Sequence, residues 1–138
     1  MGLSFSEKLG YAGLVPFVVG AIATIIGVEG ADELFKLYSV LILAFMAGGC
    51  WGIEQAHPEQ INEIPVELSV GVFIWGILAY FLPTNISVLM FSVGFWLLLW
   101  TESNPIFKDT YTKSYKRMRN VLTTVVTVLH IMVFIAVN

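Results

Sequence analysis

Charged residues are scarce in this sequence. Asp, Glu, Lys and Arg make up only 12% of its 138 residues, whereas hydrophobic residues make up 57% and the mean hydropathy is +0.82. A soluble domain carries roughly 25% charged residues. The shortage of charge therefore excludes a water-soluble globular domain, and we expect the chain to lie in a lipid bilayer and to bind no nucleic acid.

Residues that bind metals and haem are equally few. Cys50 is the only cysteine, and the only histidines are His57 and His130. One thiol cannot close a disulfide within the chain, and one thiol with two histidines falls short of the four ligands of a structural zinc site. The pair Glu54-x-x-His57 occurs once, whereas metal sites in helical bundles use this motif twice. The two histidines lie at such different depths that haem ligation by both is poorly supported, and we expect no cofactor.

Sequence motifs of familiar enzyme classes are missing as well. The chain has no nucleophile elbow, no phosphate-binding loop and no zincin motif. It also has no obvious inverted repeat of the kind found in transporters. We therefore expect a protein that is not an enzyme.

What the sequence does contain is a series of apolar segments, judged against the roughly 20 residues that a helix needs to span the hydrocarbon core. Five segments stand out, at 9–28, 34–56, 66–82, 86–101 and 120–137. The third and fourth are short, and Pro83-Thr84-Asn85 between them is a turn signal. Residues 1–138 are thus predicted to form one all-α membrane domain of about five helices. The third and fourth helices form a tight hairpin that either crosses the bilayer or re-enters on the same side.

Six of the seven basic residues fall on one side of this predicted topology. They are Lys8 near the N-terminus and, between the fourth and fifth segments, Lys108, Lys113, Lys116, Arg117 and Arg119. Basic residues favour the cytoplasmic side, so the N-terminus is predicted to be cytoplasmic and the C-terminus outside. The absence of an Arg- and Ser-rich presequence before Leu9 favours the bacterial inner membrane over the mitochondrial inner membrane.

Four of these basic residues are predicted to cluster at the membrane interface: Lys113, Lys116, Arg117 and Arg119. Tyr115, Met118 and Leu122 recur among them at helical spacing, which predicts that the last helix begins in the headgroup region. The cluster is interpreted as a topology signal, with contact to anionic lipid as the alternative. The acidic 54–67 loop lies on the same predicted side, and we expect at least one contact between its carboxylates and the cations of the 102–119 loop.

Small residues recur every four positions in and around the second segment, at Ala44, Gly48, Gly52 and Ala56. Such a ridge lets two helix backbones approach closely in lipid, so it is predicted to be a helix-packing surface. The favoured partner is another helix of the same chain, and the first helix, which Pro16 is expected to bend, is a candidate. The alternative is a helix of another subunit. Cys50 and Glu54 fall on the opposite face, where Glu54 and His57 are expected to face water at the interface.

An ionisable residue lies near the middle of the last segment. His130 must face protein or water there, because a polar side chain is costly in lipid. Thr123, Thr127 and His130 fall on one stripe, which predicts a row of hydrogen bonds against another helix. A proton relay or a polar path is the alternative.

Three motifs, taken in order, carry a family resemblance: LGYAGLVPFV at 9–18, YSVLILAFMAGGCWG at 38–52 and YKRMRNVLTTVVTVL at 115–129. The chain resembles an uncharacterised family of small multi-pass membrane proteins. This is a bacterial domain of unknown function whose relatives include the animal mitochondrial transmembrane protein 69. The resemblance implies a five-helix inner-membrane protein and no established activity. Cys50 stands where the family pattern often has histidine, so no role that needs an imidazole is carried over to this position.

Two functions of different kinds follow from these observations. The first is a non-enzymatic accessory or assembly subunit, or a homo-oligomer, that acts through helix–helix association with other membrane subunits or with itself. The second is a small transporter or channel-like protein with a polar path near His130. An intramembrane enzyme or haem protein has the least support.

Overall fold

The computed structural model describes residues 5–56, 66–103 and 111–138, and these form helices and no strands. The helices are α1 (Phe5–Ala12), α2 (Leu14–Ile25), α3 (Ala31–Gln55), α4 (Val66–Tyr80), α5 (Thr84–Thr101) and α7 (Lys113–Val137). The all-helical fold predicted from the sequence is confirmed. The last helix begins at Lys113, ahead of its apolar segment, as the spacing of its aromatic and apolar residues predicts.

Four stretches in the described part of the chain are long and apolar enough to cross a membrane. They are Glu7–Ile25, Ala31–Gln55, Thr84–Thr101 and Lys113–Val137. The apolar part of α4, Leu68–Tyr80, is shorter. At 1.5 Å per residue, the 15 residues of α4 extend over about 22 Å, less than the ~30 Å hydrocarbon core.

The first long stretch is interrupted at Gly13, between α1 and α2. Pro16 has no amide proton to donate to the carbonyl of Ala12, which weakens the helix at this point. The hydroxyl of Tyr38 donates to the carbonyl oxygen of Gly13 at 2.7 Å, so a side chain of α3 supports the break. The two helices thus divide at Gly13, one turn before Pro16, while Gly13 keeps a right-handed helical backbone and its amide still donates to the carbonyl of Leu9 at 3.0 Å.

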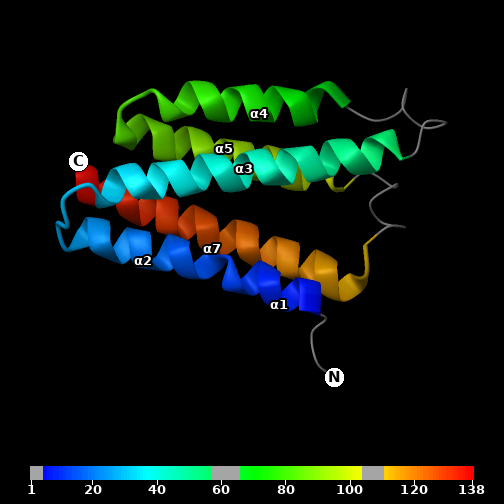
Figure 1. The fold of residues 1–138 in the computed structure, drawn as a ribbon, viewed down its shortest axis with the longest axis horizontal. Coiled ribbons are helices and arrows are strands. Elements are labelled where there is room, and N and C mark those ends of the chain that lie inside the picture. The colour runs from blue at the N-terminus through cyan, green and yellow to red at the C-terminus, as the bar shows by residue number, and fades with distance from the viewer. Residues whose placement is uncertain (1–4, 57–65, 104–110) are drawn as a thin grey trace.

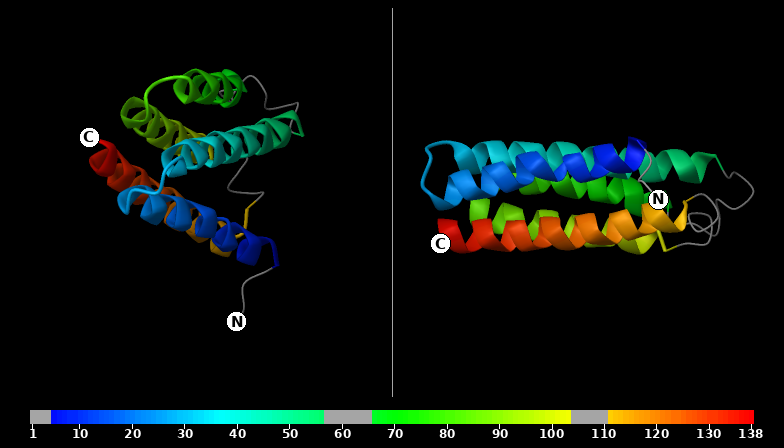
Figure 2. Two further views of the ribbon diagram at one scale, coloured as in Figure 1. Left: turned by 60° about the vertical axis from the view of Figure 1, so that its left-hand side comes forward. Right: turned by 90° about the horizontal axis from the view of Figure 1, so that it is seen from below.

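The helices are arranged around a common axis in the spatial order α4, α3, α2, α7, α5, with α5 returning to α4 (Figure 1). Helix α3 also contacts α5 across the bundle. The right-hand view of Figure 2 shows the helices nearly parallel or antiparallel to one another. Between α2 and α3 the chain turns through Gly27 and Gly30, whose φ angles of 85° and 80° lie in the left-handed region that glycine tolerates best.

Helices α4 and α5 pack closely against Leu43 of α3, which is completely buried. A Cβ atom added to Gly76 of α4 would lie 2.9 Å from Leu43 Cδ2, and one added to Gly94 of α5 would lie 3.0 Å from the same atom. At both positions, a residue larger than glycine would collide with Leu43. This contact fixes how α4 and α5 lie against α3.

The two ends of the bundle differ in charge. At one end, called here the basic end, α1 and α7 begin, and the described basic residues Lys8, Lys113, Lys116, Arg117 and Arg119 lie on these two helices. At the opposite end Lys36 is buried, and its Nζ donates to the carbonyl oxygen of Leu82 at 2.8 Å. Thr84 also donates there to Asp32 at 2.9 Å. Apart from Lys36, the described cations thus share one end.

Candidate functional site

A buried ion pair lies at the basic end, between the end of α5 and the first turns of α7. Arg119 is 3% exposed and Glu102 is 8% exposed. Arg119 Nε donates to Glu102 Oε1 at 2.9 Å, and Nη2 donates to Oε2 at 2.7 Å. Such a two-pronged contact matches the planar guanidinium to the carboxylate and is among the stronger hydrogen-bonded pairs in proteins. It joins two helices that are neighbours in space.

Side chains from α3 and α4 extend this ion pair into a larger group of buried polar residues. Cys50 Sγ donates to Glu102 Oε2 at 3.8 Å, and Glu54 lies one helical turn beyond Cys50 on the same face of α3. Ser69 of α4 donates to Glu54 Oε1 at 2.7 Å. We call Cys50, Glu54, Ser69, Glu102 and Arg119 the polar cluster, since all five are buried and they come from four helices.

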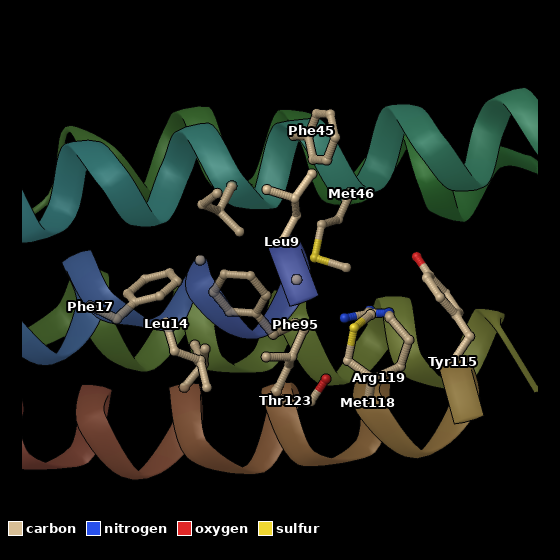
Figure 3. Close-up of a pocket in the computed structure, with 15 residues that line it drawn as sticks. Leu9, Leu14, Phe17, Phe45, Met46, Phe95, Tyr115, Met118, Arg119 and Thr123 are labelled. Atoms are coloured by element: carbon tan, nitrogen blue, oxygen red, sulfur yellow. The ribbon is translucent and has the colours of Figure 1, made fainter. Parts of the chain in front are cut away.

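Arg119 forms part of the wall of two cavities. One has a volume of about 370 Å³ and lies between the α1–α2 break, α3, α5 and α7 (Figure 3). The other has a volume of about 330 Å³ and is lined by Glu102, Tyr111 and Lys116 as well as Arg119. Burial raises the pKa of the Tyr111 phenol, and the nearby Glu102 carboxylate raises it further, so this ring remains neutral over the physiological range. Arg119 therefore lies between an apolar cavity and a more polar one.

Thr123 lies one turn after Arg119, on the wall of the larger cavity. It is 2% exposed, and its hydroxyl has no hydrogen-bond partner. Thr124 and Thr127 of the same helix behave differently, because their hydroxyls donate to the backbone carbonyls of Asn120 and Thr123, at 2.9 and 2.8 Å. Unlike these two threonines, Thr123 therefore leaves its hydroxyl without an acceptor.

His130 is completely buried in the middle of α7. Its Nδ1 donates to the carbonyl oxygen of Val126 at 2.7 Å, and its Nε2 is 2.9 Å from the hydroxyl of Ser39 on α3. Four phenylalanine rings surround the imidazole, with centroids 4.7 to 6.2 Å away: Phe17, Phe35, Phe91 and Phe95. Both nitrogens have partners and the surroundings are aromatic, which favours a packing role for His130 over a polar path.

The predicted stripe of Thr123, Thr127 and His130 is only partly buried in the structure. Thr123 and His130 are buried on the same face of α7 as Arg119, whereas Thr127 is only half-buried. The Thr127 hydroxyl accepts a hydrogen bond from Trp96 Nε1 at 2.7 Å. The buried polar stripe of α7 therefore consists of Arg119, Thr123 and His130.

The small-residue ridge lies on the outer face of α3, away from Leu43 and Cys50 in the core. Gly48, Gly52 and Ala56 are exposed, while Ala44 is half-buried. A Cβ added to Gly48 or Gly52 would meet nothing within 4 Å. The expectation that the first helix covers this ridge is wrong: α2 meets α3 on another face, where Phe17 packs against Phe35 and Tyr38.

The predicted basic cluster and the acidic residues near it also separate. Lys113 and Arg117 are exposed, whereas Arg119 is buried in the ion pair. The expectation that Glu54 faces water is wrong, because its side chain is completely buried. His57, Lys108, Glu59 and Glu63 lie outside the described residues, so the predicted contact between the acidic and basic loops stays a prediction.

Sequence reasoning missed Glu102 as a partner for Arg119. The signal was present in their positions, because Glu102 directly follows one apolar segment and Arg119 directly precedes the next. Two neighbouring helices that end and begin at the same depth bring such residues together. Among the described residues there is no group of three His, Cys, Asp or Glu side chains that is arranged to hold a metal ion.

Comparisons with known proteins agree with this picture of a membrane protein without an assigned activity. A search of the curated proteins finds no match, and neither does a search of the solved structures. Residues 6–135 match the family model described as "Protein of unknown function (DUF3429)". The match extends over nearly the whole chain, from the start of α1 to the end of α7. The chain therefore belongs to this family of proteins of unknown function.

Proposed function

We propose that this chain is a small integral inner-membrane protein that acts, without catalysis of its own, as an accessory or assembly subunit through helix–helix association. The observation that carries the proposal is the uncovered glycine ridge on α3. A partner helix from outside the described chain, either of a second copy or of another membrane subunit, would lie on this ridge.

The surroundings of the ridge support this role. Gly48 and Gly52 project from the outer face of α3 with open space above them, and Phe45 beside them is 78% exposed. Helices in lipid associate mainly through close van der Waals packing, which small residues allow because the backbones can approach. Phe45 offers a large apolar surface at the edge of the same face. Together they form a shallow surface with a raised border.

The charge distribution supports an orientation with a cytoplasmic N-terminus and an outer C-terminus. The exposed cations Lys8, Lys113 and Arg117 gather at the basic end, and basic residues favour the cytoplasmic side of a membrane. The C-terminus lies at the opposite end, where Asn138 contacts Asn85. We assign the bacterial inner membrane, with the mitochondrial inner membrane as the second choice and α4 as a short fifth crossing.

Replacing Gly48 and Gly52 together by leucine is expected to weaken association by at least about tenfold, which corresponds to about 1.4 kcal/mol. Leucine side chains would hold a partner backbone away from α3, yet their Cβ atoms would meet nothing within 4 Å in the described part of the chain. Energy transfer between labelled copies in liposomes measures self-association. Co-purification from native membranes measures association with another subunit.

Gly71→Leu is the matched control, since Gly71 of α4 is also exposed and a Cβ there would also meet nothing within 4 Å. This variant should associate like the wild type. Equal association of wild type, control and the double leucine variant, with all three folded, would rule out the ridge as the contact surface.

A further inference from the structure

The larger cavity combines apolar walls with a small polar region. Its volume is about 370 Å³, within the range of about 300 to 1,000 Å³ typical of small-molecule sites. Most of its lining is apolar, including Leu14, Phe17, Met46 and Phe95. Its polar groups include the Arg119 guanidinium and the Thr123 hydroxyl, one helical turn apart on α7, and the Tyr115 phenol (Figure 3).

The cavity lies beside the break in the first membrane stretch. Gly10, in the last turn of α1, and Gly13, which directly follows it, both line the cavity, and Met118 of α7 packs against Gly10. Interrupted helices are tolerated at membrane depth where the irregular backbone lines a cavity. The bend at Gly13 therefore sets α1 and α2 at the positions that leave this space open.

The cavity is accessible from the outside of the bundle. Leu9 and Phe45 belong to its lining, and they are 57% and 78% exposed. Both are apolar, so the entrance faces the lipid environment. A ligand that enters here must be soluble in the bilayer.

The unpartnered hydroxyl of Thr123 indicates what the ligand must offer. Leaving a buried donor without a hydrogen bond costs about 1 to 3 kcal/mol, and Thr124 and Thr127 avoid this by donating to their own helix. Thr123 does not. Its side chain lines the cavity, and a ligand oxygen that reaches the hydroxyl would satisfy it.

The charge balance at the polar region defines the ligand further. Arg119 is already neutralised by its two-pronged contact with Glu102. A negatively charged headgroup would compete with the Glu102 carboxylate for the guanidinium, and a cationic one would meet Arg119 at the wall. A neutral oxygen acceptor fits both neighbours, and a carbonyl group is the common one among membrane-soluble molecules.

We propose that this cavity binds one neutral, membrane-soluble amphiphile whose carbonyl oxygen accepts a hydrogen bond from Thr123 beside Arg119 and whose tail lies along Phe17, Phe95 and Met46. Two sources share this chemistry: the ring carbonyl of a quinone with an apolar tail and the ester carbonyl of a glycerolipid. Phe45 borders both this site and the glycine ridge, but neither Gly48 nor Gly52 lines the cavity, so ligand binding can be tested separately from the association proposed above.

Binding is tested on the full-length protein purified in detergent, with three probes that differ in one property. They are decylbenzoquinone, dioctanoylglycerol and decylbenzene, which has a ring and a tail but no carbonyl. Native mass spectrometry counts bound molecules per chain, and the ligand-dependent rise in the unfolding midpoint gives relative affinities. We expect one carbonyl-bearing probe, or both, to bind with one molecule per chain, and decylbenzene to bind at least about fivefold more weakly.

Thr123→Val removes the hydroxyl and keeps the shape. This variant is expected to bind the carbonyl-bearing probe about five- to tenfold more weakly, while its unfolding midpoint without ligand stays equal to the wild type or rises. Thr124→Val, an exposed neighbour, is the matched control and should bind like the wild type. A purely structural Thr123 would lower the midpoint and leave the affinity unchanged.

Met46→Phe provides a second test that does not depend on the hydroxyl, because it enlarges a side chain within the cavity. It is expected to weaken binding of every probe that the wild type binds. Binding of the quinone alone or of the glycerolipid alone would identify the source of the carbonyl. The proposal is overturned if no carbonyl-bearing probe binds, if decylbenzene binds equally well, or if binding is unchanged in Thr123→Val or in Met46→Phe.

Discussion

Replacing Arg119 by methionine is expected to lower the free energy of unfolding by about 3 to 5 kcal/mol. The substitution would leave the buried carboxylate of Glu102 without the guanidinium that holds it at 2.9 and 2.7 Å. The penalty arises from the isolated charge and not from lost volume, because methionine fills most of the same space. Equilibrium unfolding in mixed micelles, followed by tryptophan fluorescence, measures the change.

Arg117→Met is the control, since Arg117 is an exposed cation two residues earlier on the same helix, and it should change stability little. The double variant Glu102→Leu with Arg119→Met should recover most of the loss, because it removes both buried charges together. The ion pair would contribute nothing to stability if Arg119→Met and Arg117→Met unfolded at the same denaturant concentration.

Leu43→Ala is expected to lower the free energy of unfolding by about 2 to 5 kcal/mol. Leu43 is completely buried, and the glycines of α4 and α5 that face it have no side chains to fill the space it leaves. The same unfolding experiment measures the effect. Leu41→Ala on the same helix, where the leucine is 58% exposed, is the control and should have a much smaller effect.

Because Leu43 packs against Gly94 of α5, the effect of Gly94→Ala on stability is expected to change sign when Leu43 is truncated. Gly94→Ala should destabilise the wild type, because its Cβ would lie 3.0 and 3.3 Å from the two Leu43 methyl carbons. In the Leu43→Ala background those carbons are gone, so Gly94→Ala should stabilise the chain by filling part of the space. Equal effects of Gly94→Ala in both backgrounds would show that the two residues do not interact.

The helices were predictable from the sequence because hydropathy acts locally along the chain. The apolar segments correspond to the observed helices, and the interruption of the first one follows from Pro16. The opposite placement of Gly48 and Cys50 on α3 was also predictable, since helical periodicity alone separates them by direction. These features need no knowledge of which helix lies beside which.

The partners of the polar residues were not predictable in the same way. Glu54 was expected to face water because it ends an apolar segment, but Ser69 and the neighbouring helices bury it. The cavity could not be foreseen, because it requires the break at Gly13 and three other helices at defined distances. Thr123 becomes notable only when its hydroxyl is compared with those of Thr124 and Thr127. Such features depend on tertiary packing, for which a single sequence gives no local signal.

The ion pair between Glu102 and Arg119 has a consequence for how the protein is made. A ribosome releases the chain from its N-terminus, so Glu102 enters the membrane region with α5 before Arg119 has been synthesised. Until α7 arrives, the carboxylate must stay at the water boundary, since an unpaired charge is costly in the hydrocarbon core. The pair can therefore close only once α7 has been synthesised. Its closure joins the last helix to α5 and places Arg119 in the wall of the cavity.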